Sequence, residues 1–495
     1  MGIVFRQSIK TSIVYFAGAL LGAAYTYLMA HLFLPGDAGI TRNLIIQAVV
    51  LQVFFTLGGP AVVLFYMPRM ENEPRKQQAL LTASFLAPLV TALLFSIPYF
   101  CLKHYVVSRY QLEDRVFIDK YYAWVPFFAI VWSFISLLEM QLLANMKTAV
   151  ASFMKEILLR LVLIGFIGLY YLKAINLNTF VILTILGHTV PLAGMLVVAA
   201  RTKNFGFAFS FHVFSVKEAR AIISFAWYHL LGSVTIYLMG YLDALLIASL
   251  SFKGLADAQV YSVAIFFATF LTLPYRSMTN SSTPKINEAY HRNDMALVKS
   301  LFIRSTDNML VGVLMMWLLI IPNMHNAEAL LKESYKGVGY LVLILSIGKV
   351  MDILTGPNTE LIGLSRYYKF LFRITFVLVA AILVFDRLFI PHYGLYAAAW
   401  VTTICTCCYN IFKMVFLYIR MKIHPFSTAT LKILLAAAIA ALPALLLPAV
   451  KNPFIDACYR SAVTLPVFVG LLYYIKASPD LNTYISSIRR NKRLY

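Results

Sequence analysis

The sequence predicts an all-α integral membrane protein with about fourteen transmembrane helices. Two observations predict this class. The 495 residues are 61% hydrophobic and 13% charged, with a mean hydropathy of +0.78, which leaves too little polar surface for an ordinary soluble domain. The apolar residues also gather in stretches of about 17 to 25, the length with which a helix crosses the hydrocarbon core of a bilayer.

The predicted spans are bounded by charged residues or turn residues. In chain order they cover 11–33, 43–67, 79–102, 121–144, 156–172, 178–200, 221–250, 258–280, 301–322, 337–356, 370–390, 395–418, 429–450 and 457–475. The first span follows Arg6 and Lys10, as the apolar core of a signal peptide would. It is long enough to cross a bilayer, so we expect it to remain uncleaved.

The basic residues indicate the orientation of the chain. There are 42 Lys and Arg against 21 Asp and Glu, and with a cytoplasmic N-terminus most of the 42 fall in cytoplasmic segments. This is the positive-inside pattern, which predicts an even number of spans with both termini in the cytoplasm. The excess charge therefore reports orientation and not a nucleic-acid partner. The basic tail 478–495 suits anionic lipid headgroups, or serves only as a solvated signal for orientation.

A weak internal repeat predicts two lobes of six spans. Gly58, Gly59 and Pro60 interrupt the second span, and Pro274 occurs at the matching point of the eighth. We expect these four residues to act as hinges. The lobes are predicted at 1–200 and 201–420, followed by two further spans and a tail at 421–495. Gly18 and Gly22, four residues apart, predict close helix packing in the first span.

Few ionisable side chains lie within or beside the spans, where a charge is costly and needs a partner or a role. Cations facing a cavity would bind an anionic substrate group through charge-assisted hydrogen bonds. The candidates for that role are Arg276, Lys349, Arg160, Arg42 and Arg69. Carboxylates could carry a coupling ion, Na⁺ or H⁺. The candidates for that role are Asp352, Asp243 and Glu139.

Each candidate also has a structural explanation. Arg276 could extend to the headgroups, and Arg42 and Arg69 could serve only to orient the chain. Lys349 and Asp352 are three residues apart, so they could neutralise each other on one helix face.

Several functional classes lack their motifs. The sequence has no P-loop, no Gly-x-Ser-x-Gly and no His-Glu-x-x-His, and the five cysteines include no cluster with His or carboxylate neighbours. We therefore expect a transporter and not an enzyme, with neither a cofactor nor a metal site.

Three segments carry a resemblance to a known family. They are the opening MGIVFRQSIK, the turn LPGDAGI at 34–40, and the exit of the second span at Met67, Pro68 and Arg69. With the layout of spans, they resemble bacterial polysaccharide flippases, the Wzx-type members of the multidrug/oligosaccharidyl-lipid/polysaccharide (MOP) exporter superfamily. The resemblance extends over the whole chain in layout.

The resemblance implies a protein of the bacterial inner membrane that serves the synthesis of surface polysaccharide such as the O-antigen of lipopolysaccharide. Its substrate would be an undecaprenyl-pyrophosphate-linked oligosaccharide, moved to the outer leaflet by alternating access between the two lobes and driven by an ion gradient. Polysaccharide assembly proteins would be its partners. A cation-coupled multidrug exporter, a lipid II flippase and a non-transporting scaffold are the alternatives.

Overall fold

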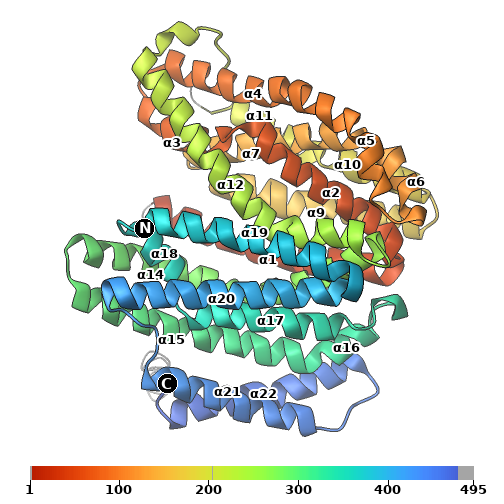
Figure 1. Cartoon of the computed structure of the whole chain (residues 1–495), viewed down its shortest axis with the longest axis vertical. Coiled ribbons are helices and arrows are strands. Elements are labelled where there is room, and N and C mark those ends of the chain that lie inside the picture. Colours follow the sequence, from red (N-terminus) through yellow and green to blue (C-terminus); the bar gives the residue numbers. More distant parts are fainter. Residues whose placement is uncertain (1–2, 203–204, 478–495) are drawn as a thin grey trace, which may run out of the picture. The chain divides into compact units, whose positions relative to one another are not determined.

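A computed structural model describes residues 3–202 and 205–477, and within these the side chains of 3–13, 276–277, 280–281, 291 and 368 are not described. The described chain is helical, without strands (Figure 1). Eleven described helical segments are long and apolar enough to cross a membrane, and the helix Leu255–Phe270 is shorter and also apolar. The all-α membrane class predicted from the sequence is confirmed.

Each predicted span has a helical counterpart. The first seven are α1 (Ile3–Leu32), α2 (Pro35–Thr56) with α3 (Gly59–Tyr66), α4 (Pro74–Cys101), α7 (Trp124–Ala144), α8 (Thr148–Ser152) with η2 (Phe153–Leu158) and α9 (Leu159–Tyr171), α10 (Leu177–Gly187) with α11 (Thr189–Ala200), and α12 (Val216–Leu250). The others are α13 (Leu255–Phe270) with α14 (Leu273–His291), α15 (Met295–Ile320), α17 (Val338–Leu354), α19 (Tyr368–Tyr393), α20 (Leu395–Met421), α21 (Thr428–Leu446) and α22 (Pro453–Tyr474).

Short helices connect the spans. They are η1 (Pro68–Met70), α5 (Lys103–Ser108), α6 (Leu112–Tyr121), η3 (Phe211–Val213), η4 (Ile321–Asn323), α16 (Met324–Ala329), η5 (Glu333–Tyr335) and α18 (Asn358–Leu364). The chain forms two compact units, 1–259 and 260–495, which meet within α13. The lobes expected at 1–200 and 201–420, with the further spans and tail at 421–495, stay a prediction.

In the first unit, α7 packs against α2, α3, α4 and α11, and α12 packs against α2 and α3. The predicted interruption of the second span is a break between α2 and α3. Leu57 and Gly58 both have positive φ, at 47° and 77°, and Pro60 lies in the first turn of α3. A Cβ on Gly58 would also collide with the backbone of Ala226 in α12, so glycine is required there by conformation and by space.

The close packing expected at Gly18 and Gly22 is present. A Cβ on Gly18 would lie 2.8 Å from Glu156 Cβ, and one on Gly22 would lie 3.0 Å from Arg160 Cζ. Small residues on α1 therefore make room for charged side chains of η2 and α9.

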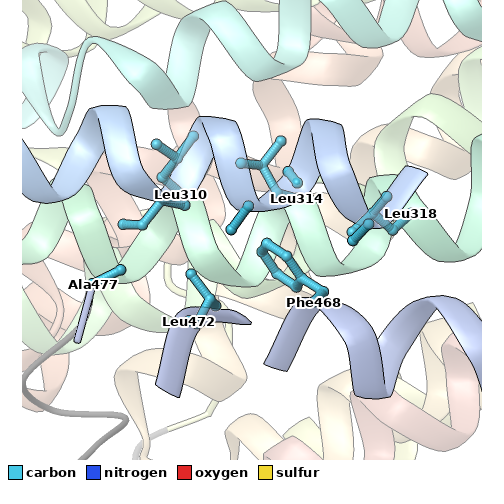
Figure 2. Close-up of a cluster of buried hydrophobic side chains, with 10 residues drawn as sticks. Leu310, Leu314, Leu318, Phe468, Leu472 and Ala477 are labelled. Carbon is cyan, nitrogen blue, oxygen red and sulfur yellow. The ribbon is translucent and has the colours of Figure 1, made fainter. Parts of the chain in front are cut away.

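In the second unit, α15 packs against α14, α17, α21 and α22. Leu310, Leu314 and Leu318 follow one face of α15 at a spacing of four residues and meet Phe468 and Leu472 of α22 (Figure 2). All of these side chains are buried. The two C-terminal helices thus belong to the hydrophobic core of this unit.

A buried ion pair also holds α22 in place. The carboxylate of Asp456 accepts hydrogen bonds from Arg460 Nε at 2.6 Å, from Asn326 Nδ2 at 2.6 Å and from the backbone N–H of Val450 at 2.8 Å. Arg460 in turn donates to the carbonyl oxygen of Leu447 at 3.0 Å. With its hydrogen-bonding groups engaged in this way, this pair joins α22 to α16 and to the segment after α21.

The eighth span is also broken, between α13 and α14, where residues 271–272 leave the helix. Pro274 lies in the first turn of α14, where it replaces an N–H that has no helical partner. A Cβ on Gly312 of α15 would lie 2.7 Å from Pro274 Cβ, so the two helices approach closely here. Both spans of the predicted repeat are therefore interrupted beside a proline.

Candidate functional site

A lysine lies in the interior of the second unit. Lys413 of α20 is 0% exposed. Its Nζ donates a hydrogen bond to Thr359 Oγ1 at 2.8 Å, lies 3.9 Å from Asp352 Oδ1, and stands 4.2 Å from the centre of the Tyr409 ring. A buried ammonium is costly unless neighbouring groups compensate its charge. The contacts of Lys413 provide this compensation, so the site holds one fixed cation.

Two carboxylates accompany this lysine. Asp352 lies near the end of α17 and Glu360 in the first turn of α18. Gly356 separates the two helices, and its φ of 76° is a conformation that glycine adopts without strain. The side chain of Asn358 donates to Thr355 Oγ1 at 2.9 Å and supports the same turn. A left-handed turn of the backbone thus places Asp352 and Glu360 on successive short segments beside α20.

Hydroxyl groups complete the cluster. The Tyr275 hydroxyl of α14 lies 3.1 and 3.2 Å from the two carboxylate oxygens of Glu360, to which it donates. The Tyr409 hydroxyl shares a hydrogen bond of 2.9 Å with Thr375 of α19. We call Asp352, Glu360, Lys413, Thr359 and Tyr275 the Lys413 cluster. Its members come from α14, α17, α18 and α20, and Figure 1 shows α17 and α20, which are in contact, running side by side.

The two charged groups of the ion pair differ in exposure at the surface of the described chain. The side chain of Lys413 is 1% exposed and that of Asp352 is 38% exposed. The carboxylate is therefore the more accessible partner for a proton or a cation, whereas the lysine is held inside. Chemically, the cluster contains one ammonium, two carboxylates and two hydroxyls, which suits the binding and release of a small cation or a proton.

Asp352 is the predicted coupling residue that the structure places in this cluster. Lys349, on the same helix, forms no ion pair with Asp352 or with any other described residue, so the alternative of a neutral pair on one helix face is not the arrangement present. The sequence analysis missed Lys413 and Thr359. Lys413 lies inside the predicted span 395–418, so the criterion that selected Lys349 applies to it as well.

The first unit contains a second group of charges, in two pairs. Lys155 Nζ of η2 lies 2.8 Å from Glu139 Oε2 of α7, and Arg160 Nη2 of α9 lies 2.8 Å from Glu156 Oε2. Arg160 also donates to the carbonyl oxygen of Gly18. We call these four charged residues the paired cluster. The π-helical turn η2 supplies Lys155 and Glu156, and such turns are frequent at functional sites.

The remaining predicted residues are dispersed. Arg69 is exposed, with its guanidinium carbon 3.4 Å from the centre of the Phe65 ring. Arg42 is half-buried, and its Nε is buried without a hydrogen-bond partner among the described residues. Asp243 is buried in α12. Arg276 belongs to α14, and its side chain lies outside the described residues.

No set of three or more His, Cys, Asp or Glu side chains in the described parts of the chain is arranged to hold a metal ion. The five cysteines are free thiols.

Comparisons with known proteins show the fold. No protein-family model matches the sequence, and no curated protein matches it. Among solved structures, the lipid II flippase MurJ in an inward closed conformation is similar, with a TM-score of 0.74, 13% identity, and coverage of 94% of this chain and 99% of that one.

Drug transporters are similar as well. An inward-facing multidrug resistance MATE family transporter of the MOP superfamily has a TM-score of 0.64 at 10% identity and covers 85% of this chain and 98% of its own. A Vibrio cholerae MATE transporter has a TM-score of 0.56 at 12% identity, covering 83% and 95%. The chain thus shares the fold of the lipid II flippase and of these MATE transporters.

Proposed function

We propose that this protein is a flippase that moves an undecaprenyl-pyrophosphate-linked oligosaccharide from the cytoplasmic to the outer leaflet of the bacterial inner membrane, for surface polysaccharide synthesis. The observation that carries the proposal is the extent of the fold match. The lipid II flippase covers 94% of the chain with a TM-score of 0.74, against 85% and 0.64 for the first MATE transporter. A lipid-linked substrate is therefore favoured over a free drug.

The substrate has three parts, and each needs a different environment. Its pyrophosphate calls for cations, its glycan for water and its lipid for an apolar surface. We assign the pyrophosphate to Arg276, Lys349, Arg42 and Arg69, with Arg160 as the weakest candidate because Glu156 neutralises it. Arg42 is the best candidate in the first unit, since its buried Nε has no partner among the described residues.

Transport would proceed by alternating access, with the two helix breaks as hinges. Gly58, Gly59 and Pro60 lie at the break between α2 and α3, and Pro274 at the break between α13 and α14. An ion gradient would drive the cycle through Asp352 in the Lys413 cluster. Asp243 and Glu139 are the alternative coupling residues. Glu139 is paired with Lys155.

A reconstituted system tests the function directly. Purified full-length protein in liposomes is supplied with an undecaprenyl-pyrophosphate-linked oligosaccharide, and an impermeant glycosidase reports the fraction of glycan on the outside. We expect protein-dependent movement of this lipid, with an ethidium efflux assay as the comparison. Efflux of ethidium without movement of the lipid would assign the chain to drug export, and movement of lipid II alone would assign it to cell-wall synthesis.

The first testable prediction concerns Arg276. Arg276→Ala and Arg276→Glu are expected to reduce the display of surface glycan in cells while the amount of protein in the membrane stays normal, because the pyrophosphate loses a charged partner. Display is measured with a glycan-specific lectin and protein by immunoblot. Normal display in both variants would remove Arg276 from the mechanism and would favour a scaffold in which charged residues of the spans are dispensable.

A further inference from the structure

The ammonium of Lys413 occupies the place in its cluster that a bound cation would take. It donates a hydrogen bond to the Thr359 hydroxyl oxygen at 2.8 Å, lies 3.9 Å from a carboxylate oxygen of Asp352 and stands 4.2 Å from the centre of the Tyr409 ring. These are the types of group that surround a monovalent cation in a protein: oxygen atoms and a π face. The side chain is tethered and 1% exposed, so it is present in every molecule and cannot leave by diffusion.

The ammonium itself opposes a metal cation beside Asp352. The titratable groups that act on Lys413 are Asp352 from α17 and Glu360 from α18, and its ammonium stands over the ring of Tyr409 from α20. Glu360 is engaged with the Tyr275 hydroxyl. A sodium ion at Asp352 would lie within a few ångströms of the ammonium, where two like charges repel strongly in a desolvated site. A proton on Asp352 meets no such repulsion, because it neutralises the carboxylate and leaves no second positive charge beside the ammonium.

One neighbouring cation bears on this balance. Lys349 lies three residues before Asp352 on α17 and forms no ion pair among the described residues. Its charge adds to the positive charge of that helix.

We infer that Lys413 is the built-in cation of this site and that the site exchanges protons and excludes Na⁺. The assignment names the ion that would drive transport, and the role of this site in coupling rests on the proposed function. In the exchange, a proton binds one carboxylate oxygen of Asp352 and makes it neutral. Lys413 keeps its hydrogen bond to Thr359 and its attraction to Glu360. Loss of the proton restores the ion pair.

Sodium binding by the purified full-length protein tests this inference without transport. The melting temperature is measured in detergent across a series of NaCl concentrations, with choline chloride at equal ionic strength as the reference. Sodium binding at Asp352 is measured as the rise in melting temperature with NaCl in a given protein minus the rise in the same protein carrying Asp352→Asn. We expect this difference to be zero in the wild type. In Lys413→Ala we expect a rise in melting temperature that grows with NaCl, because the vacated place and the unpaired carboxylates then admit Na⁺.

Lys422→Ala is the matched control. Lys422 directly follows the last residue of the same helix, and its ammonium stands over the ring of Tyr418, four residues earlier, as that of Lys413 stands over Tyr409. It is exposed, and its variant should respond to NaCl as the wild type does. A sodium response of the wild type that Asp352→Asn abolishes would overturn the inference, and this measurement holds even if Lys413→Ala does not fold.

Transport separates this inference from the proposed function. With the lipid-linked oligosaccharide in liposomes, a pH gradient without Na⁺ is expected to drive movement, and Asp352→Asn should lose that dependence. Movement driven by a Na⁺ gradient alone, and lost in Asp352→Asn, would overturn the inference while supporting the flippase. Absence of movement under every gradient would contradict the proposed function, and the melting experiment would still decide the identity of the ion.

Discussion

The paired cluster and the Lys413 cluster both place charged side chains among apolar helices, and they balance those charges differently. In the paired cluster, Lys155 and Arg160 each have a carboxylate at 2.8 Å. In the Lys413 cluster, one ammonium serves two carboxylates, with Asp352 at 3.9 Å and Glu360 bound to a tyrosine hydroxyl. The first arrangement sums to zero charge, and the second to one negative charge.

The difference indicates which cluster is available for exchange. A carboxylate with its own cation at hydrogen-bonding distance loses stabilisation when it takes up a proton, so the paired cluster resists a change of state. Asp352 has a distant partner and an exposed side chain, so it can change its state at lower cost. We therefore interpret the paired cluster as structural and the Lys413 cluster as functional.

Removal of Lys413 is expected to have the largest effect. Lys413→Met leaves Asp352 and Glu360 without their cation and removes the hydrogen bond of the ammonium to Thr359, and a hydrogen bond to a charged group contributes about 1.5–3 kcal/mol. We expect a lower melting temperature and the loss of gradient-driven transport, whereas Lys422→Met should keep both. Melting is followed by the fluorescence of the tryptophans and transport by the glycosidase assay.

Equal melting temperatures and equal transport in Lys413→Met and Lys422→Met would contradict the comparison, because they would show that the buried lysine contributes no more than an exposed one. Lys413→Arg is a useful second variant. It keeps the charge, but its planar guanidinium cannot occupy the same place as an ammonium. We expect it to fold better than Lys413→Met and to transport poorly.

An intermediate effect is expected at the contact between α1 and the paired cluster. Gly22→Leu puts a branched side chain where a Cβ alone would lie 3.0 Å from Arg160 Cζ. Overpacking of this kind costs about 1–3 kcal/mol. The melting temperature should fall while the gradient dependence of transport stays normal, because the Lys413 cluster is unchanged. Gly165→Leu, at a glycine with open space around it, is the control.

Loss of gradient dependence in Gly22→Leu would show that the paired cluster takes part in coupling. That outcome would restore Glu139 as a coupling residue and would require a revision of the division between the two clusters.

The fold could be predicted from the sequence because the length of an apolar stretch is a local property. The helix breaks at Gly58 and Pro274 could be predicted for the same reason, since glycine and proline each alter the backbone at their own position. Ion pairing is not local in this way. The proximity of Lys349 and Asp352 on one helix suggested a pair, but Asp352 meets Lys413, a residue of another helix, because α17 packs against α20. No periodicity in one sequence reveals such a partner.

The smallest effect is expected from an exchange of charges within the paired cluster. Glu139→Lys and Lys155→Glu should each lower the melting temperature, because each places two like charges at the position of a 2.8 Å pair. The double variant should recover most of the loss, with a coupling energy of about 1 kcal/mol, since the pair is partly exposed. The same exchange at Asp352 and Lys413 should not recover transport, because the half-buried hydroxyl of Thr359 and the ring of Tyr409 are arranged around an ammonium on α20. Melting curves for the four members of each cycle measure the coupling energies. Recovery of transport by the exchanged pair in the second cycle would show that the two clusters balance their charges in the same way, and would remove the distinction between them.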